Sequence, residues 1–172
     1  MNKLALVAGA TCAILISVPA CGIRGLDFVK DERVEIVAPK DDAQVTLPMT
    51  VRWKATDFAV TGPTDAATND AGYFGVFVDR APPGPGSTLA SLAEGDEVCK
   101  ATPGCPDEKY LASQRAYTTT DTSFRIERLP ELTRDRTREG HEVTIVLLDG
   151  AGRRIGESAF RVEFQIRRKV RR

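Results

Sequence analysis

The chain has 172 residues, with 24 basic side chains (Lys and Arg) balanced by 24 acidic ones, and only 6% of its residues are aromatic. This length suits a single domain. A chain with no net charge is not expected to bind nucleic acid, since proteins that do so carry an excess of basic side chains.

The first twenty residues have the composition of a secretory signal. Lys3 gives a positive start, and an apolar run follows from Leu4 to Val18. The run is shorter than the about 20 apolar residues that a transmembrane helix needs. We therefore predict that residues 1–20 are a signal peptide that is removed on export.

The run ends in Val18-Pro19-Ala20-Cys21, which resembles the lipobox of bacterial lipoproteins, with Val18 where Leu is usual and an atypical Pro19. The resemblance covers residues 1–21. It implies that Cys21 carries diacylglycerol and becomes the first residue, often with a fatty acid such as palmitate on its amine. Two or three acyl chains anchor a protein stably. The expected location is the cell membrane or outer membrane, facing outside the cytoplasm; an uncleaved anchor and ordinary secretion stay open as alternatives.

Two further cysteines, Cys99 and Cys105, remain once Cys12 has left with the signal. Disulfides persist in exported compartments, and the five residues between this pair favour a turn. We therefore expect a disulfide that closes a small loop. Zinc is the alternative, but a zinc site would need more ligands and the chain has a single histidine, His141. No cofactor is expected.

Residues 21–32 predict a flexible tether, because they combine glycines with mixed charge and show no hydrophobic period. A short strand is predicted at 33–39. Residues 49–56 alternate apolar and polar side chains, which is typical of a half-buried strand, and Trp53 is expected to anchor the core. Residues 72–80 are apolar on both faces, as in a central strand.

The polar loop at 57–71 contains three oxygen-bearing side chains that suit Ca²⁺, namely Asp65, Asn69 and Asp70. Their spacing matches no EF-hand loop. An ordinary polar loop is therefore the preferred interpretation, and the three residues are weak calcium candidates only.

Residues 81–115 differ from the chain around them. A Pro/Gly-rich stretch opens the segment, Leu89 and Leu92 stand at helical spacing, and a second short helix is predicted after Pro106. We interpret 81–115 as a partly helical insertion tied down by the Cys99–Cys105 disulfide.

Strands resume at 116–129, and 141–167 predicts a final hairpin whose turn lies at 149–152. His141 is placed at the corner before the first of these strands, where its ring is expected to hydrogen-bond the backbone in a structural role. The basic tail, 167–172, contains Arg167, Arg168, Lys169, Arg171 and Arg172. Such a tail is either a solvated terminus or a contact for anionic envelope polymer or lipid headgroups.

About seven strands separated by turns predict an all-β fold, an antiparallel β-sandwich over 33–166. Three segments resemble immunoglobulin-like and fibronectin type III-like domains: Ala38-Pro39 followed by the strand with Trp53, the stretch from Leu129 to Val143, and the Leu148–Gly152 turn. The resemblance covers about 33–80 and 116–167, and it implies a fold rather than a ligand. In such a sandwich the chain would enter at one pole and the tail would leave at the other.

The sequence contains no Gly-x-Ser-x-Gly, phosphate-binding glycine loop or His-Glu-x-x-His motif. We therefore expect a non-catalytic, lipid-anchored binding or scaffolding module that recognises a protein or envelope polymer through its loops and the 81–115 insertion. One alternative is an accessory domain or weak hydrolase acting on cell-wall polysaccharide with loop carboxylates such as Asp41-Asp42 or Asp96-Glu97. Another is a passive spacer or surface protein.

Overall fold

The computed structural model describes residues 31–63, 67–130 and 138–167. The signal peptide at 1–20, the lipidation site Cys21 and the tether up to residue 30 lie outside the described residues, as does the tail beyond Arg167. In the described ranges, none of the helices has the length and apolar character needed to cross a membrane.

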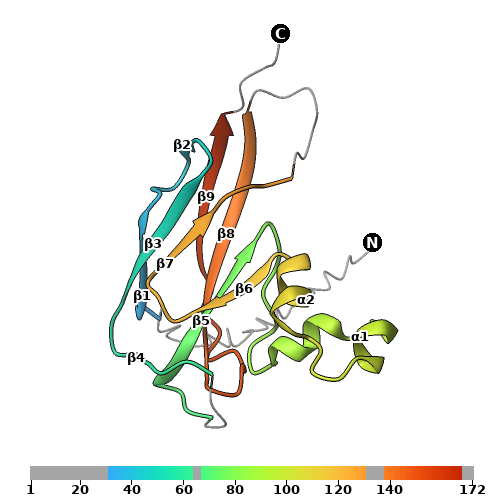
Figure 1. The fold of residues 1–172 in the computed structure, drawn as a ribbon. Helices are drawn as coiled ribbons and strands as arrows, with labels where there is room; N and C mark the ends of the chain where they lie inside the picture. The colour runs from blue at the N-terminus through green and yellow to red at the C-terminus, as the bar shows by residue number, and fades with distance from the viewer. Residues whose placement is uncertain (1–30, 64–66, 131–137, 168–172) are drawn as a thin grey trace, which may run out of the picture.

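Strands are the predominant regular structure of the described chain and helices are few and short, which is consistent with the all-β class (Figure 1). Nine strands are present in this part: β1 (Val34–Ala38), β2 (Ala43–Val45), β3 (Met49–Ala55), β4 (Ala59–Val60), β5 (Ala71–Val78), β6 (Ala116–Thr119), β7 (Ser123–Ile126), β8 (Arg138–Leu148) and β9 (Phe160–Arg167). Between β5 and β6 lie three short helices: η1 (Leu89–Ala93), α1 (Glu97–Ala101) and α2 (Glu108–Ser113). The expected count of about seven strands did not include β2 and β4.

The strands form two sheets. A three-stranded sheet has the order β1-β3-β7, and a six-stranded sheet has the order β2-β9-β8-β5-β4, with β6 also pairing with β5. The β2–β9 and β4–β5 pairings are parallel, so the expectation of a wholly antiparallel arrangement is wrong at these two edges. Strands of two or three residues, such as β4 and β2, are too short to show an alternation of apolar and polar side chains. The sequence therefore did not predict these two strands.

The main core fills the space between the two sheets. Along β3 the side chains alternate as predicted: Val51 and Trp53 are buried, whereas Arg52 and Lys54 are exposed. The ring of Trp53 meets Phe74 of β5 edge-to-face, with 5.3 Å between ring centroids. This geometry is favourable for aromatic pairs, and it joins the two sheets at their centre.

A second apolar cluster lies on the outer face of the six-stranded sheet, under the insertion. Tyr73 and Phe77 of β5 point into it, together with Val146 and Leu148 of β8. The insertion covers these side chains with residues from its own helices, chiefly Leu89 and Leu111. The strand at 72–80 is therefore apolar on both faces because it is buried on both faces.

The described chain begins in the lower half of the molecule, at the foot of β1, and ends at its top, at the tip of β9 (Figure 1). Asp31 and Glu32 lie beside Ala159 and Phe160, where β9 starts. Arg167 lies at the other end of β9, paired with Arg138 of β8. The two ends of β9 are about 23 Å apart along the strand, so the ends of the described chain are separated by roughly one strand length.

Phe74→Ala should lower the free energy of unfolding by about 3–5 kcal/mol, because it empties a fully buried site against Trp53 and Phe58. Chemical denaturation followed by Trp53 fluorescence measures the change. Val60→Ala is the control, since Val60 is an exposed residue of β4, and it should change stability by less than about 0.5 kcal/mol. Equal losses in the two variants would contradict the assigned core.

Candidate functional site

The insertion is fixed internally by a disulfide and by capped helices. Cys99 and Cys105 are bonded as expected, and Cys99 is buried. The Asp96 carboxylate accepts hydrogen bonds from the Val98 and Cys99 backbone N–H groups at the start of α1, both at 3.0 Å. These contacts satisfy amide groups that a helix cannot pair internally.

A tyrosine joins the two helices of the insertion. The Tyr110 hydroxyl of α2 donates to Asp96 Oδ2 over 3.1 Å. The hydrogen bond from the Cys99 amide is the main cause that lowers the pKa of Asp96, and the bonds from Tyr110 and the Val98 amide add to it. Loss of solvation, followed by the Asp96 contact, raises the pKa of the Tyr110 hydroxyl.

A buried arginine fastens the start of the insertion to the loop between β8 and β9. Arg154 donates through Nη1 to the Pro83 carbonyl over 2.7 Å and through Nη2 to the Glu157 carbonyl over 2.6 Å. Its own backbone exchanges hydrogen bonds with Gly86 and Ser87. Burial lowers the pKa of this guanidinium. Arg154 therefore fixes the start of the insertion, and the disulfide and the Asp96–Tyr110 hydrogen bond fix its helices.

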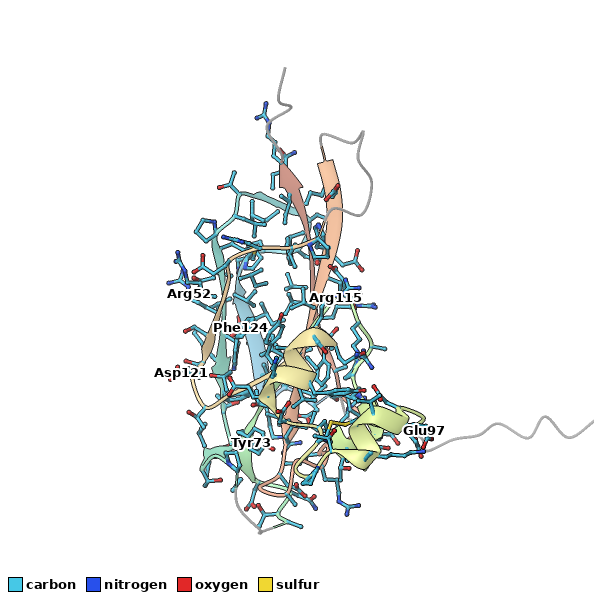
Figure 2. The ribbon with its side chains drawn as sticks, turned by 45° about the vertical axis from the view of Figure 1, so that its right-hand side comes forward. Arg52, Tyr73, Glu97, Arg115, Asp121 and Phe124 are labelled. Atoms are coloured by element: carbon cyan, nitrogen blue, oxygen red, sulfur yellow. A yellow bond between two sulfur atoms is a disulfide. The ribbon has the colours of Figure 1, made fainter. Side chains whose placement is uncertain are left out.

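The outer side of the insertion faces solvent. Val98 on α1 is 78% exposed, the larger exposure of the two well-exposed large apolar side chains in the described part. Glu97, which points away from the β-sheets in Figure 2, pairs with Lys100 over 2.8 Å. This surface therefore offers an apolar side chain within a charged frame on a fixed support.

His141 lies inside β8 rather than at a corner before it, and its ring bonds a carboxylate rather than the backbone. Nδ1 lies 2.8 Å from Asp79 Oδ2, and a carboxylate can only accept, so the ring nitrogen donates. Asp79 has a φ of 49° directly after β5, and its Oδ1 also accepts the Glu142 amide over 3.0 Å. The expectation of a backbone hydrogen bond was wrong because the partner, Asp79, lies just after β5 and 62 positions away in the sequence.

The other side of the ring has a second acid. His141 Nε2 lies 3.6 Å from Glu139 Oε2, too far for a hydrogen bond, and this nitrogen has no hydrogen-bond partner among the described residues. The nearest hydroxyl in sequence, that of Thr144, instead donates to Glu142 Oε1. Within the described chain, no hydroxyl or thiol is hydrogen-bonded to the ring.

A polar cavity of about 420 Å³ lies beside His141 and is lined by Asp42, Asp79, Glu142 and Glu163. Glu142 is already engaged by the Thr144 hydroxyl and, at 3.3 Å, by Arg161. Two carboxylates of this cavity, those of Asp79 and Glu142, therefore accept hydrogen bonds from neighbouring residues.

The acid pairs considered for a hydrolase also have structural partners. Asp41 Oδ1 accepts the Glu163 amide at the edge of β9 over 2.9 Å. Asp96 caps α1, and Glu97 pairs with Lys100. The structure does not bring these two acid pairs together at one site.

The structure describes two of the three calcium candidates. Asp65 lies outside the described residues, and the carbonyls of Asn69 and Asp70 accept from Arg33 and from the Ala59 amide. Across the described ranges, no group of three or more His, Cys, Asp or Glu residues is arranged to hold a metal ion.

The remaining residues singled out in the sequence are Trp53, the basic tail and Cys21. Trp53 is 3% exposed in the core. Arg167 is exposed at the end of β9, whereas Arg168, Lys169, Arg171, Arg172 and Cys21 lie outside the described residues.

Comparison with protein-family models, with curated proteins and with solved structures gives no match to this chain. A functional assignment therefore depends on the chain's own residues.

The hydrogen bonds to Asp96 predict an acid-sensitive insertion. Because its folded pKa is depressed, Asp96 contributes stability above the ordinary pKa of about 3.9, and that stability is lost as pH falls through the lower folded value. Asp96→Asn should therefore flatten the pH dependence of unfolding below pH 4. Denaturation of both proteins between pH 6 and 2 measures the difference. Glu97→Gln is the control, since it removes an exposed carboxylate of the same helix whose ion-pair partner, Lys100, is itself exposed. Parallel curves for wild type and Asp96→Asn would contradict the assignment.

Replacing both Cys99 and Cys105 by Ser should cost about 2 kcal/mol, the chain-entropy value for a loop of this length. Amide exchange should rise in α1 and α2 but not in β3 or β8, because the closed loop lies wholly within the insertion. Hydrogen-exchange mass spectrometry resolves the two regions. Equal loosening of the β-sheets would show that the disulfide supports the whole domain.

Proposed function

We propose that this protein is an exported, lipid-anchored binding module that presents the 81–115 insertion to a protein or polymer of the cell envelope. The observation that carries the proposal is the way in which the insertion is held. One face is buried on the sheet, and the disulfide, the Asp96–Tyr110 bond and Arg154 fix the rest. An exposed apolar residue on a rigid support is suited to recognition, because little conformational entropy is lost on binding.

The strand order supports an immunoglobulin-like sandwich as the fold. Immunoglobulin domains place strands A, B and E in one sheet and G, F and C in the other, with C′ beside C in some of them. The order β1-β3-β7 fits the first set, and β9-β8-β5-β6 fits the second. In this correspondence the insertion joins C to C′. Domains of this class commonly bind or space other molecules, although the fold specifies no ligand.

The two ends of the described chain give the anchored molecule an orientation. Cys21 and Asp31 are ten positions apart in the sequence, and a fully extended chain of that length reaches at most about 35 Å. Arg167 lies at the end of β9 away from Asp31. In our proposal the basic tail, 167–172, therefore faces away from the anchoring membrane, where anionic envelope polymers or a partner would meet it.

A non-catalytic role is favoured over the hydrolase alternative because Asp79 and Glu142, which line the polar cavity, are held by local hydrogen bonds. A polysaccharide hydrolase would need one carboxylate for protonation and another for water or the sugar. If cell-wall polymer were cleaved by the purified protein and Asp79→Asn abolished the cleavage, the hydrolase would replace the binding module.

The anchor is tested by the intact mass of protein extracted from membranes, for wild type and Cys21→Ala. We expect a wild-type mass equal to residues 21–172 plus diacylglycerol and a fatty acid, and an unlipidated, non-membrane Cys21→Ala protein. A wild-type protein without lipid would contradict the anchor while leaving the binding role to be tested.

The recognition surface is tested by placing a photo-cross-linking amino acid at position 98 in living cells, with position 60 as the matched exposed control. A discrete cross-linked product is expected from position 98 alone. Val98→Asp in a second copy should fail to compete for it, whereas Val60→Asp should compete normally, both with unchanged thermal unfolding. Identical patterns from the two positions would favour the passive spacer.

A further inference from the structure

A groove lies between β6 and β7, on the side of the molecule seen in Figure 2. The smaller sheet has three strands and ends at β7, whereas the larger sheet extends to β6. A groove of about 340 Å³ lies between these two edges. In Figure 2, Phe124 of β7 and Arg115, which precedes β6, lie on opposite sides of this groove.

The outer edge of β7 has main-chain groups available for pairing. Trp53 N–H donates to the Thr122 carbonyl, and hydrogen-bonded positions alternate along an antiparallel pair, so Phe124 and Ile126 use their main-chain groups toward β3. The N–H and C=O of Arg125 consequently face the groove side. In the part of the chain that the structure describes, β7 pairs only with β3. The edge could thus accept one more strand.

The interior of the groove is apolar. The rings of Tyr117 and Phe124 are 4.8 Å apart between centroids, and each is half-buried rather than enclosed. Val78, Ile126 and Leu129 are buried around them. A strand added beside β7 would cover the two rings with every second side chain, as its neighbours do along the core.

The rim of the groove is basic. Its lining contains Arg115, Arg125 and Arg128 against one acid, Glu127. Arg115 is 40% exposed and lies 3.5 Å from Asp79, whereas Arg125 pairs with Glu127. Arg125 and Arg128 are exposed. The side chains of an added strand that point outward would therefore lie next to positive charge.

We propose that this groove binds an extended acidic segment of a partner protein, which adds to β7 as the fourth strand of the smaller sheet. The segment alternates apolar residues, which enter the groove, with Asp or Glu, which face the arginines. Main-chain pairing gives affinity, and the alternation gives specificity. This surface is separate from Val98 and does not depend on the proposed role of the insertion.

The probe is an acetylated and amidated nonapeptide of alternating Glu and Val, with a Lys–Val counterpart and a Glu–Val version N-methylated at every second residue to block strand pairing. We expect the Glu–Val peptide to bind by fluorescence anisotropy, more tightly at low salt, and to shift the amide resonances of β6 and β7. The counterpart and the methylated peptide should not bind. Binding by the methylated peptide, shifts confined to other strands, or no binding by the Glu–Val peptide would overturn the proposal.

Variants separate charge from main-chain pairing. Arg125→Glu should weaken binding roughly tenfold, since it turns a cross-strand attraction into a repulsion. Arg125→Pro removes one groove-facing N–H without breaking the ladder to β3, so it should bind more weakly than Arg125→Ala. Arg161→Glu on β9, at the other side of the molecule, is the charge control and should bind as wild type. Thermal unfolding confirms that each variant is folded. Equal binding by Arg125→Pro and Arg125→Ala, or equal weakening by Arg161→Glu, would overturn the proposal.

Discussion

Burial of β5 on both faces is the constraint on which the rest of this structure depends. Its inner face carries Phe74 and Val76 against the smaller sheet, and its outer face carries Tyr73 and Phe77. Burial of one such ring contributes about 1.5–3 kcal/mol. The outer face therefore needs a cover, and the insertion provides it. The insertion is part of the domain's core as well as a displayed surface.

The end of β5 is organised around one carboxylate. Asp79 turns the chain with a positive φ and binds both the His141 ring and the Glu142 amide of β8. It prolongs the contact between β5 and β8 beyond their last paired residues, Val78 and Val143. Because both carboxylate oxygens are used, the histidine is held in a fixed orientation next to the polar cavity. The same carboxylate therefore holds the junction of the two strands and orients the imidazole ring.

The sequence predicted the features that depend on neighbouring residues. Alternation along 49–56 placed Trp53 in the core, and the spacing of Cys99 and Cys105 with a turn between them indicated the disulfide. Features that depend on distant residues were missed. Nothing near His141 in the chain indicates Asp79, and no motif marks Arg154, whose partners are carbonyl groups of two separate loops. The parallel edges were missed for a related reason, since β2 and β4 are too short to show a period.

The insertion connects β5 and β6, which are already adjacent antiparallel strands. A short hairpin could make the same connection, so topology places no limit on the length or content of this segment. What limits it is the apolar patch beneath, which Leu89 and Leu111 cover. The stretch between these two leucines, about 95–107, is therefore a natural position for exchange. A designer could replace this disulfide-closed stretch with another loop, as antibody loops are exchanged on a constant framework, while leaving both sheets intact.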